Sequence, residues 1–287
     1  MPVSGIVCGH DGSYQSFDSC ITCHQNRGPR NCHFPTFALK IMRDNDRKRV
    51  GAGYSATTLL NCPRAVALLE QYDYYEDLES GWNKIRGELI HMAYEAEPDI
   101  PQGVIKEQRL RKTVLVDGVP INVTGKADEI DVINASIIDL KFTGVIPEQD
   151  KVDHIAQYNI YAWLCDGGVF IRDDPTQGIK AGDTLNLTIK NGGMHYLTLK
   201  RKKKRDGRII LPWRKVAYPL WDAAKTEALV IERLTPLVRF RQTRMLPTCN
   251  PYYTERHWTC DCSRIEKQLT DRGISIVEEQ FHENTVG

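Results

Sequence analysis

Two neighbouring segments near the middle of the chain show the alternation of apolar and polar positions that is typical of β-strands. In residues 137–142 the even-numbered positions are apolar, whereas Asp139 and Lys141 share the opposite face. The preceding run, residues 121–133, is also rich in strand-forming residues, and the short turn at residues 134–136 predicts that the two strands pair. One face of this hairpin is predicted to pack, and the other is available for chemistry.

Helical spacing of apolar positions predicts three longer elements. Residues 85–94 and 155–164 are each expected to form a helix, and so are residues 219–244, where Pro236 predicts a kink. Frequent Gly, Asp, Pro and Asn in residues 166–215 predict strands and hairpins instead. The order of these segments indicates a mixed α/β protein.

Composition narrows the class without identifying it. The chain has 287 residues, 41% of them hydrophobic, and a net charge of +1, which suits one catalytic domain and a small module but gives no overall attraction to nucleic acid. With no signal peptide and no apolar run long enough for a membrane span, we expect a reducing compartment such as the cytoplasm. We find no internal repeat and no phosphate-binding motif of the G-x-x-x-x-G-K-[ST] type.

The hairpin gathers charges that suit a metal ion. If its strands pair, Asp128 lies beside Asp139, and Lys141 shares their face. Neighbouring carboxylates repel each other unless a cation stands between them, and carboxylate oxygens suit a hard ion such as Mg²⁺ or Mn²⁺. Such an ion can activate water against a phosphodiester. A lone D-x-K is more often two ordinary surface charges of a half-exposed strand.

Three further segments accompany this acidic pair: Gly87–His91 upstream, Gly125–Asp128 on the first strand, and Gln157 with Tyr161 on the downstream helix. Together these residues resemble the PD-(D/E)XK nuclease superfamily, in particular its RecB-like branch, over residues 54–165 and 245–263. The resemblance implies a restriction-endonuclease-like α/β core, with a central mixed sheet flanked by helices. It also implies a metal-dependent DNA nuclease, expected to be an exonuclease on single-stranded or end-bearing DNA.

The resemblance also implies a role for each site residue. His91 and Asp128 would bind the metal together with Asp139, Leu140 would contribute its backbone carbonyl, and Lys141 would be the catalytic lysine. Gln157 and Tyr161 would form the Q-x-x-x-Y element beside the site, and Glu107 takes the place of a further acidic residue. Without this context, His91 is more often a packed or surface histidine, and Tyr161 a core aromatic.

The late cysteines add a second feature. One early cysteine, Cys62 in the segment S-A-T-T-L-L-N-C-P-R, is followed by Cys249, Cys260 and Cys262. This order resembles the iron–sulfur staple of the same nuclease branch, in which four thiolates hold a 4Fe–4S cluster. The late trio is spaced C-x(10)-C-x-C, whereas the family usually has C-x-x-C-x(5)-C, so zinc is the alternative metal.

The first 34 residues contain four more cysteines, Cys8, Cys20, Cys23 and Cys32, interleaved with three histidines, His10, His24 and His33. The C-x-x-C pair predicts a structural zinc site, completed by four thiolates or by three thiolates and a histidine. The alternative is a flexible tail with unliganded thiols. Cys165 is left over as a buried thiol.

One basic run gives a local attraction to DNA. It comprises Lys200, Arg201, Lys202, Lys203, Lys204 and Arg205, and Asp206-Gly207 after it suggests a hairpin tip between residues 196–199 and 208–211. A solvated loop is the alternative reading.

The predicted organisation is therefore a cysteine- and histidine-rich module at 1–34, a basic connector at 35–53, a nuclease domain at 54–263 and a C-terminal tail at 264–287. The resemblance implies DNA as the partner, with a helicase or a recombination or CRISPR adaptation protein as further candidates, in a prokaryotic or phage-infected cell. Two alternatives remain open: a catalytically inactive DNA-binding subunit with the same fold, or a zinc-module scaffold protein.

Overall fold

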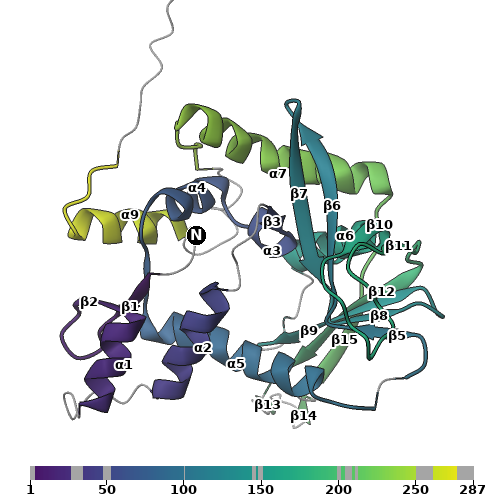
Figure 1. Cartoon of the computed structure of the whole chain (residues 1–287), viewed down its shortest axis with the longest axis horizontal. Coiled ribbons are helices and arrows are strands. Elements are labelled where there is room, and N and C mark those ends of the chain that lie inside the picture. The colour runs from purple at the N-terminus through teal and green to yellow at the C-terminus, as the bar shows by residue number, and fades with distance from the viewer. Residues whose placement is uncertain are drawn as a thin grey trace, which may run out of the picture.

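The chain forms a mixed α/β structure in which helices surround two five-stranded sheets (Figure 1). The computed structural model describes residues 4–26, 35–47, 53–99, 101–143, 147, 151–198, 202–203, 209–210, 213–249 and 261–276. Within this part of the chain, no helix combines the length and apolar character needed to cross a membrane.

The elements before the second sheet are β1 (Gly5–Val7), β2 (Tyr14–Ser16), α1 (Phe17–Gln25), α2 (Thr36–Arg47), β3 (Tyr54–Ser55), α3 (Ala56–Leu59), α4 (Pro63–Gln71), β4 (Tyr75–Glu76), α5 (Leu78–Glu95), β5 (Val104–Lys106), β6 (Arg109–Val116) and β7 (Val119–Lys126). The elements that follow are β8 (Glu129–Asp131), β9 (Ser136–Phe142), α6 (Val152–Cys165), β10 (Asp166–Phe170), β11 (Thr184–Asn186), β12 (Asn191–Leu197), β13 (Lys202–Lys203), β14 (Ile209–Ile210), β15 (Trp213–Ala217), α7 (Ala223–Thr243) and α9 (Asp261–Asp271).

The two large sheets meet where β7 ends and β8 begins. The first sheet has the order β11-β10-β6-β7-β3, and the second has the order β15-β12-β9-β8-β5. We expected one strand-rich run over residues 121–133, but the chain breaks at Ala127 and Asp128 and passes from the first sheet to the second. The break places Asp128 at the junction of the two sheets.

The register of the second sheet aligns three acidic residues. β8 pairs antiparallel with β9, with Glu129 opposite Ile138, which continues to Asp128 opposite Asp139. β5 pairs antiparallel with β8, and just beyond it the Glu107 amide donates to the Asp128 carbonyl at 3.1 Å. Glu107, Asp128 and Asp139 therefore lie in one row across the sheet, which we call the carboxylate row.

Helix α6 forms the centre of the main core. Its sequence has apolar side chains on most faces, and residues 156–161 and 163–165 are all buried, including Cys165, which is 0% exposed as predicted. Gly125 permits its close approach to β7, because a Cβ there would meet Leu164 Cδ1 at 2.5 Å and Tyr161 Cδ1 at 2.9 Å. The packing fixes α6, and with it Gln157 and Tyr161, beside the carboxylate row.

The N-terminal elements pack against helix α5. Ile6, Phe17 and Ile21 are buried in a cluster with Leu39 of α2 and Ile85 of α5. β1 also pairs in parallel with β4, so residues 5–25 are joined to the rest of the chain by strand pairing and by apolar contacts. Residues 36–47, which were predicted to be a basic connector, form the helix α2.

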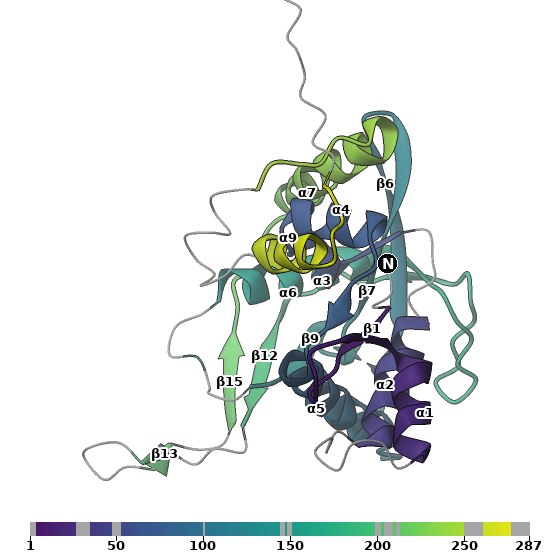
Figure 2. The same ribbon diagram turned by 90° about the vertical axis from the view of Figure 1, so that its left-hand side faces the viewer.

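Three more helices, α4, α7 and α9, lie on the side of the first sheet. Helix α4 packs against both α7 and α9, and the three lie close together in Figure 2. The predicted helices at residues 85–94 and 155–164 are confirmed as parts of α5 and α6, and α7 contains Pro236 within its span.

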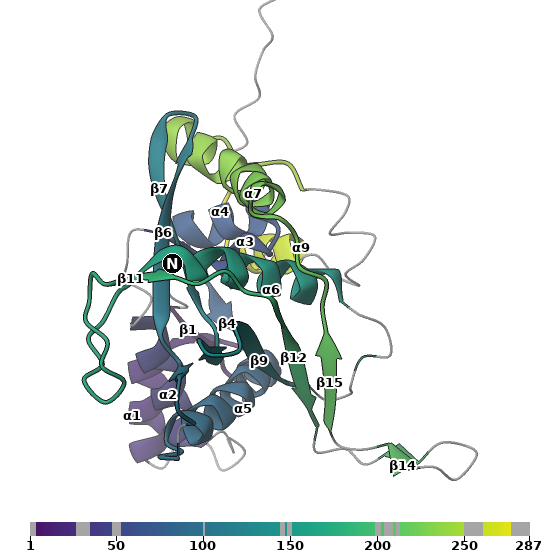
Figure 3. The same cartoon turned by 90° about the vertical axis from the view of Figure 1, so that its right-hand side faces the viewer.

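The predicted hairpin at the basic run is partly wrong. Leu197 of β12 pairs with Trp213 of β15, and not with residues 208–211. Lys202 and Lys203 form β13 and pair with β14 beyond the ends of β12 and β15 (Figure 3). Lys200, Arg201, Lys204 and Arg205 lie outside the described residues, as do Cys32, His33 and Cys260.

Candidate functional site

One imidazole and two carboxylates converge at the junction of the sheets. His91, on the last turns of α5, places Nδ1 2.9 Å from Asp128 Oδ1 and 3.4 Å from Glu107 Oε1. The three side chains can each offer one ligand atom to a common ion, because those atoms all lie within 4.8 Å of one another. The two carboxylate oxygens suit hard ions such as Mn²⁺ or Mg²⁺, and the imidazole nitrogen is a donor typical of transition-metal sites.

Glu107 occupies a strained position in this site. Its φ of 55° lies in the left-handed region, which non-glycine residues adopt at a cost of about 1–3 kcal/mol. The side chain is buried, with Oε1 toward His91 and Oε2 in an ion pair with Lys126. In this backbone conformation, the buried Glu107 carboxylate contacts both His91 and Lys126.

Asp128 is held from two sides. Its Oδ1 contacts His91, and its Oδ2 accepts a hydrogen bond from the Leu140 amide at 2.5 Å. Burial raises the pKa of Asp128 to about 7; His91 opposes this shift, and the charge of Asp139 adds to it. The Leu140 amide is the contact that the structure shows, and the expected role of the Leu140 carbonyl stays a prediction.

The pKa of His91 is raised to about 10, chiefly by its hydrogen bonds to Asp128 and then Glu107. For Glu107, burial alone would raise the pKa, but the hydrogen bonds from His91 and Lys126 prevail and leave it below the ordinary value. Without a metal, the imidazolium therefore serves as the cation between two carboxylates.

Asp139 and Lys141 form the next part of the site. Lys141 Nζ lies 2.6 Å from Asp139 Oδ2, and the Asp139 side chain is almost fully buried, whereas Lys141 remains partly exposed. The expected proximity of Asp128, Asp139 and Lys141 is thus present along β9 and the β7–β8 junction. Asp139 is not part of the three-residue ligand group in the described chain.

Helix α6 contributes the Q-x-x-x-Y pair. Gln157 Nε2 donates to the Tyr161 hydroxyl at 2.6 Å, and both side chains are buried. Burial raises the pKa of Tyr161 well above its ordinary value, and the charge of Asp139 raises it further. Tyr161 is therefore a neutral hydroxyl near the acidic residues.

His154 lies one turn before Gln157 and was not predicted from the sequence. Its Nδ1 lies 2.5 Å from the Tyr196 hydroxyl, and Tyr196 is opposite Lys141 in the β9–β12 pairing. Burial lowers the pKa of His154 to about 3, and the charges of Lys141 and Lys151 contribute. His154 is a neutral hydrogen-bonding residue at the edge of the site.

Lys126 was also missed. It is the last residue of β7, two positions before Asp128, and its ammonium forms an ion pair with Glu107 Oε2. No local pattern in the sequence indicates this contact. Arg109 pairs with Lys126 across β6 and β7 in the first sheet.

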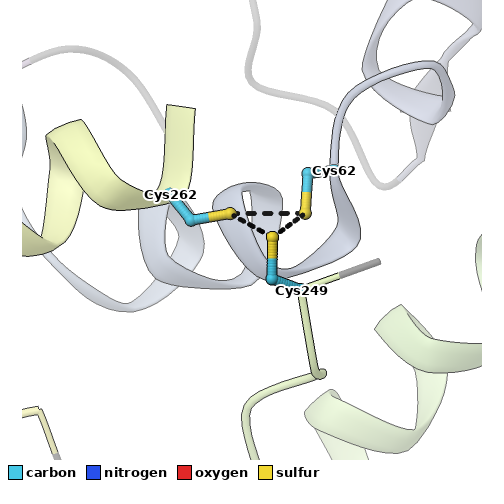
Figure 4. A group of neighbouring side chains, drawn as sticks. All are labelled: Cys62, Cys249 and Cys262. Atoms are coloured by element: carbon cyan, nitrogen blue, oxygen red, sulfur yellow. Dashed lines mark hydrogen bonds between the residues drawn. The ribbon is translucent and has the colours of Figure 1, made fainter. Parts of the chain in front are cut away.

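A separate group consists of the three cysteines Cys62, Cys249 and Cys262, which we call the cysteine group (Figure 4). Their sulfur atoms are 3.8 Å apart for Cys62 and Cys249, 3.5 Å for Cys249 and Cys262, and 3.3 Å for Cys62 and Cys262. Cys62 caps the N-terminus of α4, and Cys262 lies at the start of α9. The cysteine group therefore lies where the starts of α4 and α9 meet.

The sulfur separations bear on which metal suits the cysteine group. Zinc–sulfur bonds of about 2.3 Å in a tetrahedron place sulfurs about 3.8 Å apart, close to the values here. The thiolates of a 4Fe–4S cluster bind different irons and stand further apart, so the observed spacing fits a single ion better. The three cysteines form a group that could hold a metal ion.

The N-terminal cysteines are arranged differently. Cys20 is buried among the apolar residues that join α1 to α2 and α5, Cys23 is exposed and Cys8 is half-buried. Within the described residues, these three are not among the groups that can place three ligand atoms around one ion. The predicted N-terminal zinc site stays a prediction, since Cys32 lies outside the described residues.

Comparison with known proteins adds little to this geometry. No protein-family model matches the chain, and no curated protein matches it. A solved structure described as the crystal structure of SSO0001 is 20% identical, with 69% of this chain and 84% of that chain covered and a TM-score of 0.47. This similarity is too low to identify a family.

Proposed function

We propose that this chain is a metal-dependent DNA nuclease of the RecB-like branch of the PD-(D/E)XK superfamily. The observation that carries the proposal is the convergence of His91, Glu107 and Asp128 within ligand distance, beside the Asp139–Lys141 pair. These residues come from α5, from the segment after β5, from the β7–β8 junction and from β9. Five side chains distant in sequence thus form one polar site at the junction of two sheets.

The donor set fits the ion that the resemblance implies. The two carboxylates suit Mn²⁺ or Mg²⁺, and the imidazole favours a transition metal such as Mn²⁺ over Mg²⁺; water or substrate would occupy the remaining coordination positions. Bound there, the ion would polarise a phosphodiester and lower the pKa of a water molecule.

The residues around the ligands have separate tasks in this proposal. Lys141, partly exposed and paired with Asp139, is placed to orient the attacking water and to stabilise the charge that develops on the phosphate. Gln157 and Tyr161 hold the α6 side of the site through their mutual hydrogen bond. The Leu140 amide fixes the orientation of Asp128.

The cysteine group would act as a structural staple. It joins the start of α4, the segment after α7 and the start of α9, and Arg64 reinforces the same contact by pairing with Glu266 at 2.6 Å. The resemblance implies a 4Fe–4S cluster here, with Cys260 as the fourth ligand, and the sulfur separations favour zinc. Either metal would close a loop that contains the whole proposed active site.

Digestion of end-labelled single- and double-stranded DNA tests the proposal. We expect the wild-type protein to cut DNA with Mg²⁺ or Mn²⁺ and not with EDTA, and Lys141→Ala to lose at least about 100-fold in rate. Lys180→Ala, at an exposed loop lysine, is the matched control and should retain activity. A wild-type protein that binds Mn²⁺ but cuts neither substrate would instead indicate an inactive DNA-binding subunit.

A further inference from the structure

The Lys126 ammonium contacts the Glu107 oxygen that faces away from His91. Glu107 is the only carboxylate of the carboxylate row whose two oxygens face two different cationic groups in the described residues. Oε1 faces His91 and the ligand group, whereas Oε2 forms an ion pair with Lys126. In a two-ion site, a carboxylate in this position would bridge the ions.

Each flank of the ligand group is already neutralised by a lysine. Lys126 pairs with Glu107 on one side, and Lys141 pairs with Asp139 on the other. The side chains of both carboxylates are almost fully buried: that of Glu107 is 2% exposed and that of Asp139 is 3% exposed. At such sites charges interact strongly because water screens them weakly.

The balance of charge therefore limits the number of ions. The carboxylate row carries three negative charges, and the two lysines supply two positive charges, so one divalent ion already leaves the site with a single positive charge. A phosphodiester neutralises that charge. A second divalent ion would add two more positive charges beside Lys126, whose neighbour across β6 and β7 is Arg109, another cation.

We infer that this nuclease site binds one divalent ion, and that Lys126 takes the place of a second ion by holding Glu107 Oε2. The inference rests on the proposed function for the identity of the site. It adds a positioning role for a lysine that lies outside the residues matched by the family resemblance. Its substrate-side consequence is that Lys126, and not a second metal, faces the phosphate on this flank.

Electron paramagnetic resonance of bound Mn²⁺ tests the inference directly. The full chain is titrated with Mn²⁺, and the ions bound by Asp128→Asn are subtracted to isolate this site. We expect about one Mn²⁺ per wild-type chain, without the signal of a spin-coupled Mn²⁺ pair. Two coupled ions in the wild type would overturn the inference.

Substitutions of Lys126 separate its electrostatic role from a structural one. Lys126→Gln removes a positive charge near the ion, so we expect Mn²⁺ to bind more tightly, by about tenfold or more. Lys126→Glu should admit a second ion and produce the coupled signal. Lys180→Gln and Lys180→Glu are the controls, and neither should change affinity or stoichiometry.

The outcomes distinguish this inference from the proposed function. Weaker Mn²⁺ binding in Lys126→Gln would show that Lys126 only supports the fold, and would overturn the inference. A two-ion wild-type protein that cuts DNA would also overturn it and leave the nuclease proposal intact. A protein that neither binds Mn²⁺ at this site nor cuts DNA would contradict both.

Discussion

His91 Nδ1 lies 2.9 Å from Asp128 Oδ1, and this contact joins the end of helix α5 to the junction of the two sheets. The same nitrogen faces Glu107, so one imidazole connects three segments that are far apart in the sequence. A divalent ion at this position would replace the proton that the imidazole holds. Metal binding, protonation and the geometry of the junction are therefore linked.

Asp128→Asn should weaken Mn²⁺ binding by about 100-fold or more, because it removes a ligand charge while keeping the shape of the side chain. Isothermal titration calorimetry measures the loss. Asp99→Asn, at an exposed acidic residue near the end of α5, is the control and should bind Mn²⁺ as the wild type does. Equal affinities in the two variants would remove Asp128 from the ligand set.

The affinity for Mn²⁺ should rise with pH. The pKa of His91 is raised to about 10 by its hydrogen bonds to Asp128 and Glu107, so the metal-free imidazole is protonated at pH 7. An ion must displace that proton, and fewer protons compete as pH increases. We expect about a tenfold gain in affinity per pH unit between pH 7 and 8.5, and release of about one proton per ion.

Calorimetry in buffers of different ionisation enthalpy measures this proton release. Below pH 7 the dependence should become steeper, because burial raises the pKa of Asp128 to about 7 and a second proton then competes. His91→Gln should remove most of the proton release above pH 7. Affinity that does not change between pH 7 and 8.5 would contradict the linkage.

Gly125→Ala should destabilise the protein by about 1–3 kcal/mol, because the added methyl group would press on Leu164 and Tyr161 of α6. Urea unfolding measures the change. Gly87→Ala on α5 is a matched control, since a Cβ there meets nothing within 4 Å and alanine favours a helix, so its stability should stay equal or increase. A neutral Gly125→Ala would show that α6 does not depend on this close approach.

The sequence predicted which residues share a face of the β8–β9 hairpin better than it predicted how the strands before that hairpin continue. Alternation along residues 137–142 identified Asp139 and Lys141 on one face, and the short turn before them correctly predicted the β8–β9 pairing. The break at Asp128 was not predicted, because a strand that passes between two sheets keeps the same alternating composition. Its polar residues gain their new neighbours only through long-range pairing.

The contacts of Lys126 and Cys249 also depend on long-range packing, which the local sequence does not show. Nothing local indicates that Lys126 pairs with Glu107, since the contact depends on the positive φ of Glu107 and on the register of β5. The cysteine group was predicted from spacing and resemblance, and the structure brings Cys62, Cys249 and Cys262 together. The distances between their sulfurs, which bear on the metal, are set by how α4 and α9 pack.

Cys62→Ser should release a metal and lower the melting temperature by about 5 °C or more, because the cysteine group joins α4 to α9 across a long loop. The sulfur separations predict that the lost metal is zinc, at about one per chain. Metal analysis by mass spectrometry measures it, with Lys180→Ala, at an exposed loop lysine, as the control. A brown protein that loses iron and sulfide in Cys62→Ser would establish an iron–sulfur cluster instead.

The rate of DNA cleavage by Asp139→Asn under single-turnover conditions tests the central claim most directly. Asp139 is buried in the site and pairs with Lys141, so its charge is required for the proposed chemistry, whereas the shape of the residue is kept. We predict Mn²⁺-dependent cleavage by the wild type and by Asp99→Asn, and a loss of at least about 100-fold in Asp139→Asn. Equal cleavage by Asp139→Asn and the wild type, with both folded, would contradict the assignment of this site.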